Sequence, residues 1–240
     1  MNSVPKLDPF LSAEKFIITY YSSCQGAILA GSVVRGEHTS TSDLDIVIFD
    51  QSVPSSYRES LHAFGWPIEV FVHNLTSYKQ FFLLDHKAAR PSMQKMISEG
   101  LVIKDEGILE GIKQEANAQL AQGPDIWTDQ EIRFKRYFIT DTLDDFIGAS
   151  ERGEQLFIAN HLASLLHEFV LRTNRRWIGS SKWIIRALNS FDENFTEEFV
   201  KAFDHFYKSG DKSAVISLSE KILDPFGGLL FEGFSLGKGE

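Results

Sequence analysis

The segment SDLDIVIF, residues 42–49, places two aspartates at the start of an apolar stretch. Its alternation predicts a β-strand over residues 43–49. Residues i and i+2 of a strand lie on the same face, so Asp43 and Asp45 project together while the apolar side chains pack behind them. Two carboxylates about 7 Å apart along a strand repel each other in a partly buried site. A divalent cation that prefers oxygen ligands, above all Mg²⁺, would relieve this repulsion.

A third carboxylate lies on another apolar segment. PIEVFVHN, residues 67–74, alternates as a strand that carries Glu69 on the face opposite its isoleucine and valines. If this strand neighbours the first, Glu69 can join Asp43 and Asp45. Three such carboxylates resemble a two-metal phosphoryl-transfer site.

A Gly-Ser turn precedes the aspartates and indicates a phosphate site. The apolar run GAILA, residues 26–30, predicts a buried strand that Gly31 ends. Glycine lets a ligand approach the backbone closely, and the N–H groups at the start of a short helix, expected over residues 32–36, attract phosphate. Ser32 adds a hydroxyl, and Arg35 follows one turn later. Phosphate and metal sites are therefore expected at adjacent strand ends, as a nucleoside triphosphate requires.

The other N-terminal segments complete a small mixed α/β sheet. Apolar spacing predicts an opening helix over about residues 10–23. A second helix is expected over residues 57–64, ended by Gly65. The expected order is helix, strand, turn, strand, helix, strand.

The composition changes near residues 121–129, where Gly-Pro interrupts the chain. Beyond this point apolar residues recur at i, i+3, i+4 and i+7, as in residues 159–170, which is typical of packed helices. The predicted fold class is α+β. A nucleotide-handling domain with a small mixed β-sheet is expected over residues 1–124, followed by an all-helical bundle domain over residues 125–240.

The length, composition and net charge limit the class of protein. The 240 residues are 43% hydrophobic, which can fill a core, and they contain no apolar run long enough to cross a membrane. The first ten residues lack the pattern of a signal peptide, and a single cysteine excludes an internal disulfide, so a cytoplasmic protein is expected. The net charge of −9 argues against a protein that grips nucleic acid along its length.

The stretch GSVVRGEHTSTSDLDIVIF resembles the signature of the nucleotidyltransferase superfamily that includes DNA polymerase β. That signature is a hydrophobic strand, Gly-Ser, a spacer, and Asp-hydrophobic-Asp on the next strand. Arg35-Gly36 and Ser42 resemble the bacterial small-molecule branch, which holds aminoglycoside and lincosamide nucleotidyltransferases and minimal antitoxins. The resemblance covers roughly residues 26–73.

The resemblance implies roles for individual residues. Asp43 and Asp45 would bind magnesium, with two ions expected, and Glu69 would be the third carboxylate, as a metal ligand or as general base. ATP or another nucleoside triphosphate would be the co-substrate. The nucleotide-binding residues that we expect are Gly31, Ser32, Arg35, Ser42 and Lys182.

Lys182 lies in the segment RWIGSSKWIIRAL, residues 176–188. Ser180 or Ser181 is expected to cap a helix, with Lys182 just inside it. A cation there opposes the helix dipole, and a bound phosphate would reverse that penalty. Similar helical domains in the antibiotic-modifying branch use a lysine to reach the triphosphate; a plain surface lysine is the alternative.

Three aspartates mark a predicted helix of the second half. Asp141, Asp144 and Asp145 lie at i, i+3 and i+4, where like charges destabilise a helix. A solvated acidic face is one explanation. The other is a cleft between the domains that receives a cationic acceptor or helps to deprotonate its hydroxyl, and Glu154 could belong to it.

The sequence thus predicts a Mg²⁺-dependent nucleotidyltransferase that transfers a nucleoside monophosphate, AMP from ATP being the first expectation. The expected acceptor is a hydroxyl of a small, cationic molecule such as an aminoglycoside-like antibiotic. An enzyme that adenylylates a protein, as antitoxins do, and a nucleotide-binding regulator without catalysis are the alternatives. Monomer and homodimer both stay open.

Overall fold

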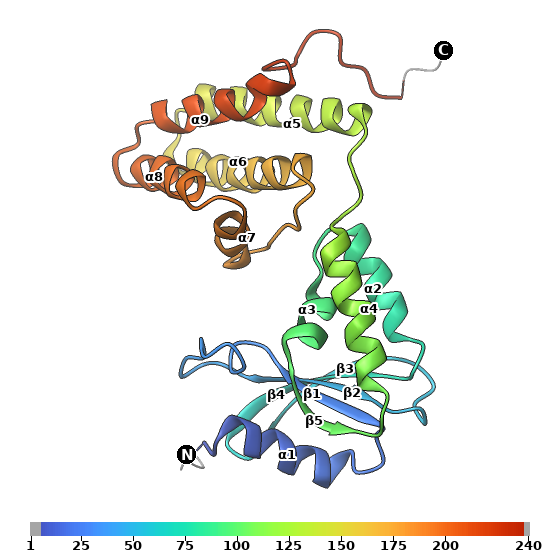
Figure 1. The fold of residues 1–240 in the computed structure, drawn as a ribbon. Helices are drawn as coiled ribbons and strands as arrows, with labels where there is room; N and C mark the ends of the chain where they lie inside the picture. Colours follow the sequence, from blue (N-terminus) through green and yellow to red (C-terminus); the bar gives the residue numbers. More distant parts are fainter. Residues whose placement is uncertain (1–5, 238–240) are drawn as a thin grey trace. The chain divides into compact units, whose positions relative to one another are not determined.

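The computed structural model describes residues 6–237 and divides into two compact units, Met1–Gly123 and Pro124–Glu240. The first unit contains a sheet and the second consists of helices (Figure 1). The predicted α+β class is confirmed. Among the described residues, no helix is long and apolar enough to traverse a bilayer.

The first unit is built on a mixed five-stranded sheet in the order β3-β4-β2-β1-β5. β2 and β4 run parallel, and the other neighbours pair antiparallel. The strands are β1 (Gly26–Ala30), β2 (Leu44–Phe49), β3 (Tyr57–Ala63), β4 (Trp66–His73) and β5 (Leu101–Asp105). The predicted strands at 26–30, 43–49 and 67–74 are confirmed within one residue, whereas β5 was not predicted.

Helices cover both faces of the sheet (Figure 1). Alternate strand residues pack against α1 (Pro9–Tyr20) on one face, where Phe16 is buried. The other set, including Ile28, packs against three helices on the opposite face. These helices are α2 (Tyr78–Lys87), α3 (Ser92–Glu99) and α4 (Leu109–Gln122). With a helix layer on each side, β1 is buried throughout and β2 at every position except Asp45, which explains their nearly continuous apolar sequence.

The helix predicted over residues 57–64 is wrong, because this segment forms the edge strand β3. Most of its side chains are exposed, so it lacks the apolar stripe that would bury a helix. Phe64 and Gly65 both have left-handed φ, 53° and 80°, and join β3 to β4 as a two-residue hairpin. The glycine that was expected to end a helix belongs to this turn.

The second unit is a bundle of five α-helices within the described residues. They are α5 (Asp129–Gly148), α6 (Arg152–Thr173), α7 (Trp183–Phe191), α8 (Glu193–Ser209) and α9 (Ser213–Leu223), followed by the 3₁₀ turn η1 (Asp224–Phe226). α5 begins at a capping box, in which Thr128 and Glu131 each satisfy the other's backbone N–H. The stripe predicted in residues 159–170 is buried at Leu162, Leu166 and Phe169.

The C-terminal segment after η1 packs on α5 of the same unit. Arg136 donates to the carbonyl oxygens of Gly227 and Gly228, at 2.8 and 2.9 Å. Phe234 stacks on Tyr137 with ring centroids 3.8 Å apart and nearly parallel planes. These contacts hold the segment along the helix.

Candidate active site

The sheet brings three predicted carboxylates together. Parallel pairing of β2 with β4 sets Asp45 opposite Glu69, and antiparallel pairing with β1 sets Asp45 opposite Ala30. Asp43 lies one residue before β2. One carboxylate oxygen from each of Asp43, Asp45 and Glu69 lies within 4.8 Å of the other two, and all three residues are half-buried. We call these residues the carboxylate triad.

The triad carries more negative charge than its surroundings neutralise. Burial, followed by repulsion from Asp43 and Glu69, raises the pKa of Asp45 to about 6. Arg35 and Arg58 oppose this shift without cancelling it. Arg58, on the edge strand β3, forms an ion pair with Glu69. A bound cation would relieve the remaining repulsion.

The turn after β1 lies directly against the triad. Gly31 has φ +81°, and a Cβ there would lie 2.0 Å from Oδ2 of Asp45. Only glycine therefore allows the backbone to pass this close to the carboxylate. The short helix expected over residues 32–36 is not formed; the segment is a series of turns, closed by a 2.9 Å hydrogen bond from the N–H of Glu37 to the carbonyl of Ser32.

Residues 31–42, which we call the 31–42 loop, fold back on themselves beside the triad. The hydroxyl of Ser32 donates to Oγ of Ser42 at 3.3 Å. The same Oγ accepts the N–H of Thr39 at 2.9 Å. Ser42 immediately precedes Asp43, so the two predicted serines meet next to the triad.

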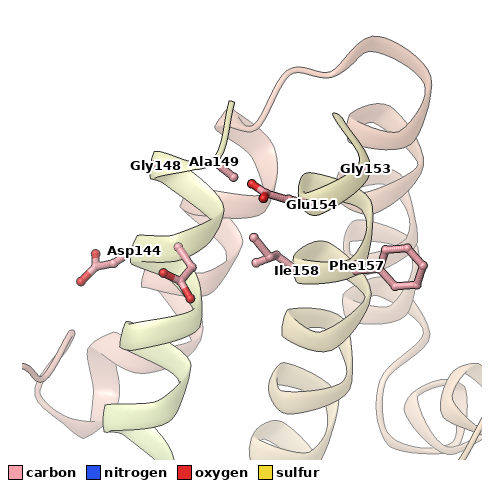
Figure 2. Close-up of a pocket in the computed structure, with 8 residues that line it drawn as sticks. Asp144, Gly148, Ala149, Gly153, Glu154, Phe157 and Ile158 are labelled. Carbon is pink, nitrogen blue, oxygen red and sulfur yellow. The ribbon is translucent and has the colours of Figure 1, made fainter. Parts of the chain in front are cut away.

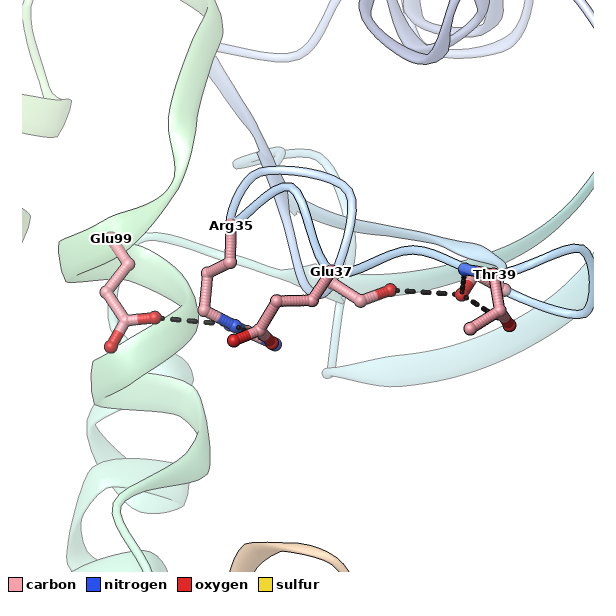
Figure 3. Close-up of polar contacts among 6 residues, drawn as sticks. Arg35, Glu37, Thr39 and Glu99 are labelled. Carbon is pink, nitrogen blue, oxygen red and sulfur yellow. Dashed lines mark hydrogen bonds and ion pairs between the residues drawn. The ribbon is translucent and has the colours of Figure 1, made fainter. Parts of the chain in front are cut away.

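Arg35 lies between two carboxylates. It contacts Glu37 of its own loop and Glu99 at the end of α3, each at 3.2 Å (Figure 3). Sequence reasoning missed Glu99, which is 64 residues away. It also missed Arg58, although a strand reading of residues 57–63 would have placed Arg58 on the same face as Ser60, the partner of Glu69.

Comparison with known families identifies this arrangement. The sequence model of the family described as "Nucleotidyltransferase domain" matches residues 15–148, which is more than half of the chain. The chain belongs to this family. It is therefore a nucleotidyltransferase, an enzyme that transfers a nucleotidyl group. The resemblance stated from the sequence is confirmed at this level.

Solved structures and curated proteins give less information about this chain. The crystal structure of a nucleotidyltransferase-like protein from Exiguobacterium sibiricum 255-15 is similar over 89% of this chain and 73% of its own, at 12% identity and a TM-score of 0.46. No curated protein matches the sequence.

In this nucleotidyltransferase, Lys182 belongs to the second unit. It is exposed and occupies the N-cap of α7, rather than a position inside the helix. Neither Ser180 nor Ser181 caps α7 with its side chain; their carbonyl oxygens accept the N–H groups of Trp183 and Ile184 in a turn. The expected cap is wrong, and a role for Lys182 at the triphosphate stays a proposal.

The acidic residues of the predicted cluster do not all line the same pocket. Asp144 and Asp145 line an open pocket of about 770 Å³ between the end of α5 and the start of α6, together with Glu154. Figure 2 shows the Glu154 side chain directed toward α5. Asp141 is exposed on α5 but does not line this pocket. All lining residues belong to the second unit, and the predicted cleft between the domains stays a prediction.

The raised pKa of Asp45 predicts how stability changes with pH. Its ordinary pKa is 3.8, so below about pH 3 the carboxyl is largely protonated in the folded and the unfolded chain alike. As pH rises from about 4 to about 6, the unfolded chain releases this proton first, and the folded state loses stability. With metal chelated, Asp45→Asn should be more stable than wild type above pH 6, by at most about 3 kcal/mol.

Urea unfolding at several pH values in EDTA measures this difference. The stability difference between the variant and the wild type should become small only near pH 3. A difference that stays constant across the range would show that repulsion within the triad does not act on Asp45.

Proposed function

We propose that this nucleotidyltransferase is a cytoplasmic, Mg²⁺-dependent enzyme that transfers AMP from ATP to a hydroxyl group of a small cationic acceptor. The observation that carries the proposal is the convergence of the carboxylate triad against the Gly31 turn. The family supports the nucleotidyl transfer itself. The metal, the nucleotide and the acceptor are the proposed parts.

The triad fits a hard divalent cation. It offers oxygen ligands alone, from neighbouring strands, and its half-buried charges repel one another in the absence of a cation. Asp43 and Asp45 would hold the metal, with Glu69 as the third ligand. When bound, Mg²⁺ supplies charge neutralisation at the triphosphate and activates the attacking oxygen.

The chain's own residues then position the reactants. The Ser32 hydroxyl and the turn at Gly31 bind the triphosphate, while Arg35, oriented by Glu37 and Glu99, supplies positive charge. The acceptor oxygen forms a bond to the α-phosphorus, the bond from that phosphorus to the bridging oxygen breaks, and pyrophosphate leaves. The hydroxyl proton passes to a carboxylate, for which Glu69 is our candidate.

The acidic pocket of the second unit supports a cationic acceptor. Asp144, Asp145 and Glu154 concentrate negative charge around a hollow of about 770 Å³, and Phe157 on its rim is 80% exposed. The Phe157 ring points away from α5 in Figure 2, so the carboxylates supply the attraction for a cationic molecule. An aminoglycoside-like molecule combines ammonium groups with hydroxyl groups that can accept AMP.

The pocket predicts which acids matter for the acceptor. Asp145→Asn and Glu154→Gln should each raise the acceptor KM about threefold to fivefold with kcat nearly unchanged, because exposed charge pairs are weak. Asp141→Asn, one turn away on α5 and outside the pocket, is the matched control and should change neither constant. Steady-state kinetics measures KM and kcat, with the acceptor that the labelling experiment identifies. Equal effects at Asp141 would assign the effect to net charge rather than to the pocket.

The experiment that tests the function uses ATP labelled at the α-phosphate. The full chain is incubated with Mg²⁺, a panel of aminoglycosides and other hydroxylated antibiotics, and separately with bacterial lysate protein. Label transferred to a small molecule, with release of pyrophosphate, is the expected result. Label on protein would favour the protein-adenylylating alternative, and absence of pyrophosphate across the panel would favour a regulator that binds nucleotide without catalysis.

A further inference from the structure

We propose that Lys6 is a positioning residue for the active site: its hydrogen bonds to the backbone of the 31–42 loop hold Ser42 and Asp43 in place. The inference rests on the proposed function only for its consequence, nucleotide binding. The anchoring itself can be tested without nucleotide.

The tip of the loop has few other supports. Residues 36–41 are exposed, and the hydrogen bonds at Thr39 and Thr41 remain inside the loop. The Lys6 ammonium group reaches in from the N-terminal segment and donates to the carbonyl oxygens of Ser40 and Ser42, at 3.0 and 3.3 Å. A charged donor shared by two carbonyls fixes both ends of the Ser40–Ser42 stretch.

Trp66 is a buried side chain that contacts both the N-terminal segment and the 31–42 loop. It is 3% exposed and begins β4, three residues before Glu69. Its indole N–H donates to the carbonyl of Leu7 at 2.8 Å, and its ring lies 4.0 Å from the Lys6 ammonium. His38 of the loop meets the same ring edge-on, with centroids 6.4 Å apart. One buried ring therefore joins the N-terminal segment, the loop and the strand that carries Glu69.

The anchor acts next to the reacting groups. Ser42, whose carbonyl Lys6 holds, contacts Ser32 through its hydroxyl and precedes Asp43 in the chain. An exposed polar loop loses conformational entropy when it closes on a ligand, and prior ordering reduces that cost. Among residues 6–237, no hydrogen bond or ion pair joins the Lys6 side chain to the triad, so Lys6 acts through the loop.

Hydrogen exchange of the full chain without nucleotide tests the anchor. Lys6→Met keeps an apolar side chain on Trp66 and removes the donors. Amides of residues 37–42 should exchange about fivefold to tenfold faster in this variant, as expected for the loss of a hydrogen bond to a charged group. Lys15→Met is the matched control, because no hydrogen bond or ion pair of the Lys15 side chain is seen among residues 6–237. Unchanged exchange in Lys6→Met would overturn the proposal, whatever the nucleotide does.

Nucleotide binding tests the consequence. The Kd of a non-hydrolysable ATP analogue with Mg²⁺ should rise about fivefold in Lys6→Met and recover in Lys6→Arg. Trp66→Phe removes the indole donor without changing charge and should shift exchange in the same direction. Faster exchange with unchanged affinity would overturn the positioning role. If the wild type binds no nucleotide, the proposed function fails, and the exchange comparison still decides whether Lys6 anchors the loop.

Discussion

Asp45→Asn is expected to reduce nucleotidyl transfer by at least about 10³-fold, because loss of a carboxylate that we propose to hold the metal removes several kcal/mol of transition-state stabilisation. Asp45 is the central member of the triad, between Glu69 on β4 and the Gly31 turn after β1. Asparagine keeps the shape of the side chain and removes the charge. Pyrophosphate release with saturating nucleotide measures the loss.

The same variant should stay folded, which separates chemistry from stability. Its free energy of unfolding at neutral pH should equal or exceed that of the wild type, since the replaced carboxylate is desolvated and repelled by Asp43 and Glu69. Asp141→Asn, an exposed substitution in the second unit, should retain full transfer. Substantial transfer by Asp45→Asn would remove the triad from the mechanism.

Gly31→Ala should have the second largest effect, an activity loss of at least about a hundredfold together with about 1–3 kcal/mol of destabilisation. Two costs combine at this position. The φ of +81° disfavours any L-residue, and the added methyl group would lie 2.0 Å from Oδ2 of Asp45. Either the turn or the carboxylate must move, and both belong to the proposed site.

Gly36→Ala separates these two costs. Gly36 has φ +70° in the same loop, but nothing lies within 4 Å of a Cβ built there. This variant should lose about 1 kcal/mol from the left-handed backbone and retain most activity. Unfolding curves and transfer rates of the two variants make the comparison. Equal activity losses would mean that loop conformation, rather than contact with Asp45, explains the need for glycine at residue 31.

Much of the site could be predicted from the sequence because its parts are local. Asp43 and Asp45 are two residues apart where β2 begins, and the period of an extended chain alone sets them on a common face. Glu69 could be assigned by pattern, since its strand alternates clearly. Its exact partner could not, because the pairing of β2 with β4 is a tertiary feature.

The errors have physical causes. The segment 57–63 is an edge strand with mostly exposed side chains, so neither apolar period stood out. Because of that error, Arg58 was not recognised as a partner of Glu69. Their ion pair forms only when β3 and β4 pair as a hairpin. Glu99 and Lys6 were missed because each reaches the 31–42 loop from more than thirty residues away, and no local pattern records such contacts.

The proposed metal and triphosphate site is tested most directly by a crystal structure of the full chain with Mn²⁺ and a non-hydrolysable ATP analogue, with anomalous data collected to locate the metal. Manganese is expected between the carboxylates of Asp43 and Asp45, with the triphosphate against Gly31 and Ser32. An ordered nucleotide bound elsewhere, or manganese bound away from these two aspartates, would contradict the proposed site.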